Sequence, residues 1–395
     1  INRIQQRSAM FEKRLPVTFG VSLLLLIAGA FLFTSNTGAK TNDGLRRRLM
    51  GDPKTVALKD ALPAIASDLL NAAEISDALN PSEPDNYWCS EPKLDPLPYY
   101  ECNPDDIVYR IPLVGGMTNA IKLVLLGAIT AFEENRCFFV DEGEAHLNNF
   151  DRTDYFENGF ISHYFERIGI SQKDPIVLKA HAEGRTKTLT WREVWEPTRN
   201  RRMFDQLTTL PSLGYHNMPG HELKTIMMQR MWRPLPEARE STCKRYYQML
   251  GRQDFLAMSV RRGDKTTENF DFISMSSYLE AADKAIQDNF EGIPPIIFVA
   301  TDDCSVLSTL RESRPTWRFI SECDKHHQEG FDLRDMAKWT NQDYDEHFGK
   351  FFVELFAMAH AKYFIGIGYT NVSWFVYFMR GGKMENFELL DAKQG

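Results

Sequence analysis

The sequence predicts an α/β protein in which parallel strands alternate with helices. Short apolar runs of strand length recur between helix-like segments in two stretches of the chain, 105–245 and 250–395. Several of these runs end in charged or polar side chains, which is typical of strands whose carboxyl ends border a ligand site. Strands separated by helices favour a parallel sheet that is covered on both faces. We therefore expect two Rossmann-like domains.

The composition is that of a globular protein with room for both domains. The chain has 395 residues, of which 43% are hydrophobic and 25% are charged. Its 54 acidic and 46 basic side chains give a formal net charge of −8. Nucleic-acid binding depends on neutralising phosphates with basic side chains, so this balance argues against a nucleic-acid partner.

An apolar segment near the N-terminus predicts a membrane anchor. Residues 17–33 are uncharged, follow basic residues in 1–16 and precede a polar stretch. The segment has the minimum length for a span, and a cleaved signal peptide would share the basic-then-apolar pattern. Positive charge on the N-terminal side predicts a type II single-pass protein with a cytosolic tail at 1–16 and a luminal remainder. Residues 34–104, polar and then rich in proline, are expected to form a stem and lead-in.

Six cysteines suit the oxidising lumen that this topology implies. They are Cys89, Cys102, Cys137, Cys243, Cys304 and Cys323. Proximity along the chain favours a disulfide of Cys89 with Cys102 and another of Cys304 with Cys323. Cys137 lies in an apolar run and is expected to be a buried thiol. Other pairings stay open, because sequence alone does not decide connectivity.

The first predicted domain begins with a strand, a turn and a helix. The run 107–113 (IVYRIPL) predicts a strand, and Gly115-Gly116 predicts a tight turn. An apolar-faced helix is expected over 119–134, followed by a strand at 137–140 (CFFV).

The second predicted domain carries four strand candidates. They are FLAMSV from Phe255, IIFVATDD at 296–303, RFIS at 318–321 and YFIGIGYTN at 363–371. Between the first two, Ser277 and Glu280 have the spacing of a capping box, which predicts a helix that begins there and ends near residue 288.

Charged side chains gather just after the first of these strands. Arg261 and Arg262 offer planar guanidinium groups that match phosphate oxygens. Asp264 and Lys265 follow within the same short loop, and Glu268 completes it with a carboxylate that can act as a base. This combination suits a phosphorylated donor, although an inert, solvated corner is the plain alternative.

Two further strand ends carry polar pairs. Asp302 and Asp303 end the second strand, where one carboxylate is expected to cap the next helix. Thr370 and Asn371 lie between the fourth strand and a helix, where backbone N–H groups and the helix dipole favour an anion. An ordinary N-cap is the alternative for this pair.

In their order and spacing, these motifs resemble the α-1,6-fucosyltransferase family, the enzymes that fucosylate the core of N-glycans, and their nodulation-factor relatives. The resemblance covers roughly 110–380 in pieces and rests on VRRGDK at 260–265, ATDD at 300–303, FIS at 319–321 and Thr370-Asn371-Val372, with weaker likeness at 114–123 and 231–241. It implies a GT-B-like fold, with the acceptor side at 105–245 and the GDP-sugar site at 250–395. It also implies a Golgi or ER membrane protein.

The resemblance implies an inverting transfer of fucose from GDP-fucose to a glycan or glycoprotein hydroxyl, O6 of N-acetylglucosamine, without a metal or other cofactor. Arg261 matches the family's arginine that contacts the pyrophosphate. Thr370 and Asn371 match its phosphate-binding Ser-Gln. Asp302 and Asp303 match its acidic pair at the centre of the cleft.

Glu354 matches a family aspartate that contacts the nucleotide base, and a carboxylate suits the N–H groups of guanine. Its alternative is a helix-surface acid paired with Lys350 four residues earlier. Glu268 is the candidate base, oriented by Lys265. The family places its base one position later, and Ser259 replaces a family histidine before the strand end.

Three other functions stay open. The shift of Glu268 and the replacement at Ser259 fit a degenerate sugar-binding pseudoenzyme. Asp343 and Asp345 form a DxD pattern that could grip a metal and diphosphate in another kind of glycosyltransferase. Arg262-Gly263-Asp264 is an RGD triplet, as in adhesion proteins.

Overall fold

The computed structural model divides the chain into two units, Ile1–Ala73 and Glu74–Gly395. The residues that the structure describes all belong to the second unit: 89, 94–97, 102–113, 115–142, 160–194, 207–210, 213–262, 273–323, 336 and 339–393. The expected tail and anchor, and most of the expected stem, lie outside them. Among these described residues, no helix is both long and apolar enough to span a bilayer.

A three-stranded parallel sheet occupies the first part of this unit. Its order is β2-β1-β3, with β1 at Val108–Pro112, β2 at Phe138–Asp141 and β3 at Thr186–Thr188. The helix α5 (Met117–Glu133) follows β1 directly and is buried along nearly its whole length. The predicted strands and the predicted helix of this region are therefore confirmed, with bounds that differ by one or two residues.

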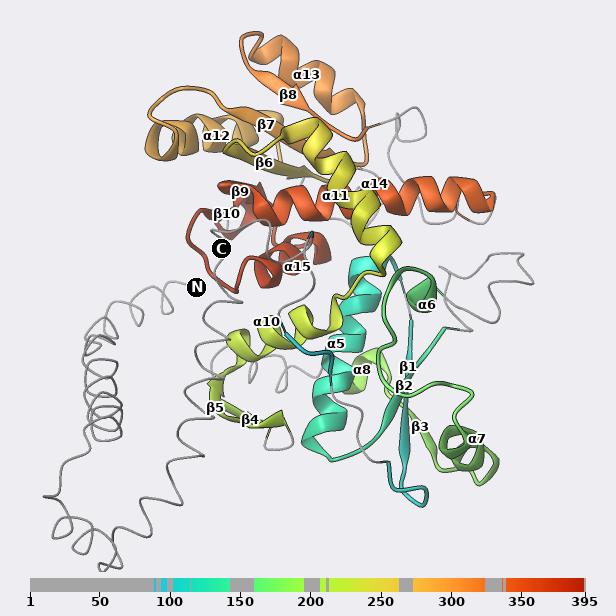
Figure 1. The fold of residues 1–395 in the computed structure, drawn as a ribbon. Coiled ribbons are helices and arrows are strands. Elements are labelled where there is room, and N and C mark those ends of the chain that lie inside the picture. Colours follow the sequence, from blue (N-terminus) through green and yellow to red (C-terminus); the bar gives the residue numbers. More distant parts are fainter. Residues whose placement is uncertain are drawn as a thin grey trace, which may run out of the picture. The chain divides into compact units, whose positions relative to one another are not determined.

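Shorter elements surround this sheet and lead to the second one (Figure 1). They are α6 (Phe160–Tyr164), α7 (Pro175–Ala182), α8 (Trp191–Val194), the hairpin strands β4 (Leu207–Leu210) and β5 (Tyr215–Pro219), α10 (Gly220–Met231) and α11 (Pro236–Leu250). Proline opens both α7 and α11, where its missing N–H costs no helical hydrogen bond.

The second sheet has five parallel strands in the order β10-β9-β6-β7-β8. Its elements are β6 (Phe255–Val260), α12 (Met275–Asn289), β7 (Ile296–Thr301), α13 (Ser305–Ser313), β8 (Arg318–Ile320), α14 (Asn341–His360), β9 (Tyr363–Gly366), α15 (Asn371–Met379), β10 (Phe387–Leu389) and the 3₁₀ turn η7 (Leu390–Lys393). All four predicted strands of this region are confirmed. Because the strand order reverses between β6 and β9, a crevice is expected at the carboxyl ends of these two strands.

Helices cover both faces of this sheet. In β6, Leu256 and Met258 point to one face, where they join a core with α12 and α13. Phe255 and Ala257 point to the other face and pack with the core that includes α11 and α14. The alternation follows from the two-residue period of a strand, and the entirely buried β6 is what a sheet covered on both sides requires.

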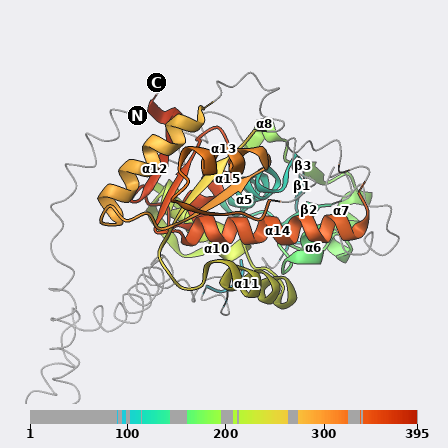
Figure 2. The ribbon, with the colours of Figure 1, turned by 90° about the horizontal axis from the view of Figure 1, so that it is seen from above.

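The core on the α14 side continues into the first sheet without a break. The rings of Phe165 and Phe352 lie 5.6 Å apart, and those of Trp232 and Phe375 lie 4.6 Å apart. Figure 2 shows α14 extending from the five-stranded sheet toward α6. The two sheets occupy the two predicted stretches, but they share one hydrophobic core, and the boundary near residue 250 stays a prediction.

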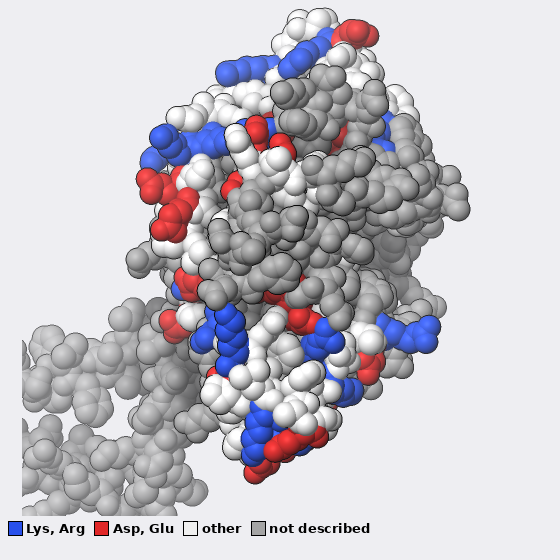
Figure 3. Space-filling model, turned by 90° about the vertical axis from the view of Figure 1, so that its right-hand side faces the viewer, with Lys and Arg blue, Asp and Glu red and all other residues white. Residues whose placement is uncertain are grey.

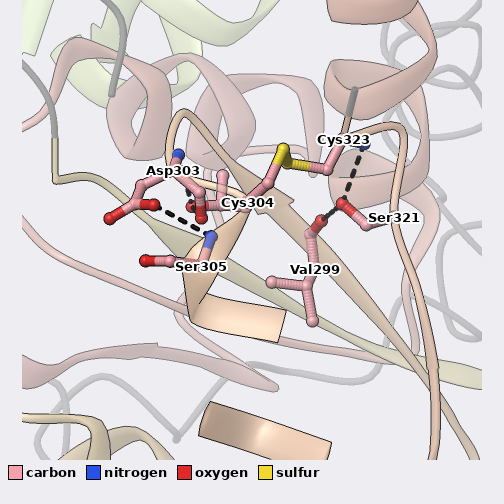
Figure 4. Close-up of a disulfide and its surroundings, with 7 residues drawn as sticks. Val299, Asp303, Cys304, Ser305, Ser321 and Cys323 are labelled. Atoms are coloured by element: carbon pink, nitrogen blue, oxygen red, sulfur yellow. Dashed lines mark hydrogen bonds between the residues drawn. A yellow bond between two sulfur atoms is a disulfide. The ribbon is translucent and has the colours of Figure 1, made fainter. Parts of the chain in front are cut away.

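The disulfides differ from those expected. The structure contains the bonds Cys89–Cys243, Cys102–Cys137 and Cys304–Cys323. The expected Cys304–Cys323 bond is confirmed and joins the ends of β7 and β8 (Figure 4). The expected Cys89–Cys102 bond and the buried thiol at Cys137 are wrong. Cys102 lies just before β1 and Cys137 just before β2, so the parallel pairing of these strands brings the two residues together.

One helix begins earlier than predicted. The N-cap of α12 is Ser274, whose side chain accepts a hydrogen bond from the backbone N–H of Ser277 at 3.1 Å. The spacing from Ser277 to Glu280 resembled a capping box, but Ser277 already lies in the first turn. Consecutive serines made the choice of cap ambiguous in the sequence.

Substituting Gly127 tests the contact between α5 and β1. A Cβ added at Gly127 would lie 2.6 Å from Cδ1 and 2.9 Å from Cγ1 of Ile111 in β1. We expect Gly127→Ala to lower the free energy of unfolding by about 1–3 kcal/mol through overpacking. Gly349→Ala in α14 is the control. A Cβ there meets nothing within 4 Å, so its higher helix propensity should raise stability by about 0.5–1 kcal/mol. Chemical denaturation of both variants measures the difference, and equal effects would contradict this packing.

Candidate functional site

A pocket lies at the carboxyl ends of β6 and β7. It has an empty volume of about 860 Å³, part of which is open solvent. The strand ends contribute Arg261 and Asp302, α14 contributes Lys350 and Glu354, and the turn before α5 contributes Gly116. The pocket therefore lies one strand away from the crevice expected between β6 and β9, which it reaches only through Val372 on α15, and the turn before α5 closes one side of it.

Asp302 holds the two arginines that follow β6. One carboxylate oxygen accepts the backbone N–H of Arg262 at 2.7 Å, and the other lies 3.2 Å from Nη1 of Arg261. Asp302 is only 5% exposed, so its charge needs these partners. The side chain of Arg261 is more exposed, at 20%, and lines the pocket.

Asp303 has a structural role. Its side chain accepts the backbone N–H of Ser305 at 2.9 Å, and its own N–H donates to Oγ1 of Thr301 at 3.1 Å (Figure 4). These bonds shape the turn from β7 into α13. The N-cap of α13 is Cys304, which makes no side-chain capping bond, so the expected carboxylate N-cap is wrong, and Asp303 instead braces the turn before the helix.

Thr370 caps α15 with its side chain. Its Oγ1 accepts the backbone N–H of Ser373 at 3.3 Å and donates to the carbonyl of Ile367 at 3.2 Å. The residue is 2% exposed, so the N-cap interpretation describes its side chain. A role for Thr370 in phosphate binding stays a prediction.

Asn371 connects α15 to α5. Its amide nitrogen donates to Oδ1 of Asn119 at 3.0 Å, and its amide oxygen accepts from Nζ of Lys122 at 3.2 Å. Burial lowers the pKa of Lys122 to about 8. A contact between Asn371 and phosphate stays a prediction. The hydrogen bonds of Asn371 to Asn119 and Lys122 fix the start of α15 beside α5.

The loop between β9 and α15 is held at both its N–H and C=O groups. Asp391 accepts the backbone N–H of Gly368 at 2.7 Å and of Tyr369 at 3.0 Å. Nε1 of Trp374 donates to the carbonyl of Gly368 at 2.8 Å. These bonds hold the turn between β9 and α15 in place. Two backbone N–H groups of this turn are already bonded to Asp391.

Glu354 is half-buried in the pocket wall, where the backbone N–H of Thr301 hydrogen-bonds to it. Desolvation, reinforced by the nearby charges of Glu322 and Asp302, raises the pKa of Glu354 to about 8. Lys350 pairs instead with Glu346, at 3.0 Å. Glu354 is thus a pocket residue and not a helix-surface acid, which leaves it placed to contact a ligand.

The sequence interpretation missed an ion pair beside Glu354. Glu322 follows β8 and is 6% exposed, and both of its oxygens accept from the guanidinium of Arg245 on α11. Glu322 could have been found as another carboxylate at a strand end. Arg245 could not, because it precedes Glu322 by 77 residues and only the packing of α11 brings them together.

Three predicted residues, Asp264, Lys265 and Glu268, lie outside the described residues.

The DxD pair is described, and its two carboxylates have separate partners. Asp343 forms a capping box with Thr340 at the start of α14, and Asp345 accepts from the hydroxyl of Tyr164 at 2.7 Å. Within the described ranges, no three His, Cys, Asp or Glu side chains are grouped so as to hold a metal ion.

Basic and acidic side chains are interspersed on the face shown in Figure 3. Blue and red groups alternate there, in keeping with the mixed charge of the sequence. Among the described residues on this face, neither sign of charge forms a large separate patch.

No family model and no curated protein matches the sequence. Solved structures do match, at low similarity. NodZ from Bradyrhizobium aligns over 69% of this chain and 92% of that chain, with 11% identity and a TM-score of 0.42. FUT1 from Arabidopsis thaliana in complex with GDP aligns over 78% and 73%, with 10% identity and a TM-score of 0.40. POFUT1 in complex with GDP aligns over 73% and 99%, with 12% identity and a TM-score of 0.39. These proteins are fucosyltransferases, the class that the motifs resemble, but likeness this distant decides nothing about the chemistry of this chain.

The raised pKa of Glu354 predicts a pH-dependent stability. Between the ordinary carboxyl value of 4.5 and about 8, the folded state keeps a proton that the unfolded state has lost. Stability should therefore fall as pH rises through this window, by up to about 1.4 kcal/mol per pH unit. Denaturant unfolding at pH 5, 6 and 7 should show a flatter profile for Glu354→Gln than for the wild type. Glu280→Gln, an exposed acid on α12, is the control, and parallel profiles for all three proteins would contradict the assignment.

Proposed function

We propose that the chain is a GT-B-like inverting glycosyltransferase that moves fucose from GDP-fucose to a glycan hydroxyl, O6 of N-acetylglucosamine. The observation that carries the proposal is the pocket at the carboxyl ends of β6 and β7, where Arg261 and Glu354 line one cavity. A guanidinium suited to phosphate and a carboxylate suited to a nucleotide base, both in one pocket, suit a nucleoside diphosphate sugar. The motif resemblance supplies the identity of the sugar.

The donor half of the mechanism follows from Arg261. When the bond between fucose C1 and the diphosphate oxygen breaks, negative charge grows on the leaving GDP. A guanidinium held by Asp302 at 3.2 Å is oriented before the reaction, so it stabilises that charge without reorganising. The N-terminus of α15 lies at the end of β9, on the other side of the same crevice, and adds a positive dipole. Protein cations and dipoles thus serve the role that a metal plays in other glycosyltransferases.

The acceptor half is assigned to the loop after Arg262. Glu268 takes the proton of the acceptor hydroxyl, the oxygen attacks C1 from the face opposite the diphosphate, and the configuration inverts. Lys265 orients the glutamate, and Asp264 and Arg262 line the donor. Sequence proximity supports this assignment, because these residues follow closely after Arg261, which comes directly after β6 and lines the pocket.

The cellular setting is part of the proposal. We assign residues 17–33 as an uncleaved anchor of a type II protein of the Golgi or ER, with the catalytic unit in the lumen. The three disulfides support an oxidising compartment. The first sheet, which closes one side of the pocket through Gly116, would carry the glycan or glycoprotein acceptor.

Arg261→Lys tests the donor contact. A lysine keeps the charge but cannot reproduce the planar fork, so turnover with GDP-fucose should fall on the order of 100-fold or more. Arg314→Lys is the matched control, because Arg314 also pairs with an aspartate, Asp283 at 2.6 Å, but is half-exposed and absent from the pocket lining. Near-normal turnover of Arg261→Lys in a glycan-array assay would refute this role.

Glu268→Gln separates chemistry from binding. The amide is nearly isosteric but cannot accept the proton, so GDP affinity should stay while transfer falls by about 100-fold or more. Equal loss of both would indicate a structural acid. A wild-type chain that binds GDP-fucose and transfers it to no glycan would favour the sugar-binding pseudoenzyme, which Ser259 in the pocket lining already suggests as the second candidate.

A further inference from the structure

Lys350 and Glu354 lie on one wall of the pocket. They are four residues apart on α14, so their side chains leave the same face of the helix one turn apart. Both line the pocket. The side chain of Lys350 is only 10% exposed, which makes it unusual for a lysine.

We propose that Lys350 recognises the nucleotide base of the donor by donating a hydrogen bond to O6 of guanine, while Glu354 accepts from N1 and N2. The inference rests on the proposed function and deepens it, because it assigns the base specificity to a residue that no motif marked. The carbonyl and the two N–H groups lie side by side on one edge of guanine. Lys350 and Glu354, one helical turn apart, offer a donor for the carbonyl and a carboxylate acceptor for the two N–H groups.

Other carboxylates near this wall are already engaged. Both oxygens of Glu322 accept from Arg245, and Asp302 holds Arg261 and Arg262. Glu354 has one backbone partner, the N–H of Thr301. A carboxylate has two oxygens with about four acceptor positions, so Glu354 keeps capacity for a ligand.

The ammonium of Lys350 can serve two acceptors at once. Its Nζ lies 3.0 Å from Oε1 of Glu346, which is 52% exposed. An ammonium has three N–H donors, so it can keep this pair while it bonds a base oxygen in the pocket. Met336, Phe351 and Met358 add apolar surface to the same pocket. Exclusion of water by these side chains strengthens a charge-assisted hydrogen bond and increases the cost of a mismatch.

The pair should discriminate strongly against adenine. Adenine presents an amino group where guanine has O6, and a lone pair where guanine has the N1 proton. The amino group would then face the ammonium and the lone pair would face the carboxylate. The contact with Lys350 becomes donor against donor, and an ionised Glu354 adds a second mismatch, acceptor against acceptor.

The test measures dissociation constants of GDP, IDP and ADP by calorimetry on the purified full-length chain. IDP keeps O6 and N1–H but lacks the N2 amino group. Lys350→Met should weaken GDP and IDP equally, by about 10- to 100-fold, because one charge-assisted hydrogen bond is lost. ADP binding should not weaken, so the preference for GDP over ADP falls by the same factor. Methionine keeps the apolar stem of the lysine, which protects the fold.

Two further variants make the result specific. Glu354→Gln should reduce the preference for GDP over IDP, whereas Lys350→Met leaves that preference intact. Lys362→Met is the matched control, because Lys362 also pairs with an acid, Asp254 at 2.8 Å, outside the pocket lining. A Lys350→Met protein with an unchanged GDP-to-ADP ratio overturns the inference, as does equal weakening of all three nucleotides. Wild-type chain that binds none of them overturns the proposed function itself.

Discussion

The buried carboxylate of Asp302 is the interaction on which the site depends. It lies at the end of β7, accepts the N–H of Arg262 and pairs with Arg261, and so ties the ends of the two central strands together. An unpaired charge at 5% exposure would cost several kcal/mol, and the guanidinium of Arg261 and the backbone N–H of Arg262 supply partners that offset this cost. The same requirement fixes the direction in which Arg261 enters the pocket.

This constraint propagates to the rest of the pocket wall. Asp302 and Glu322 are both buried and both raise the pKa of Glu354. Arg245 balances Glu322, and Arg261 partly balances Glu354. Glu354 therefore holds its proton near neutral pH in the empty pocket. A nucleotide base that donates two N–H groups to Glu354 would favour its ionised form. Binding of such a base would therefore be coupled to loss of the proton from Glu354.

The sequence predicted the parallel strands and the polar residues at their ends because strand ends in such sheets converge on one edge. Arg261, Asp302 and Glu354 could be found in this way or by resemblance. The pairings Cys89–Cys243 and Arg245–Glu322 could not, because each joins residues far apart in the chain through the packing of α11. Local ambiguity caused a different error, since nearby serines offered alternative caps for α12.

Helix α14 explains why the two sheets and the pocket are parts of one structure. One part of its surface packs in the shared core, where Phe352 contacts Phe165, while Lys350 and Glu354 line the pocket. A side chain on a long helix is placed by the packing of the whole helix, so the positions of Lys350 and Glu354 depend on aromatic contacts made by the first sheet's side of the protein. In the GT-B-like arrangement that we propose, part of the donor site lies on α14, a helix that packs against both sheets. A shift of the first sheet, the proposed acceptor side, would therefore move the pocket wall that carries Lys350 and Glu354.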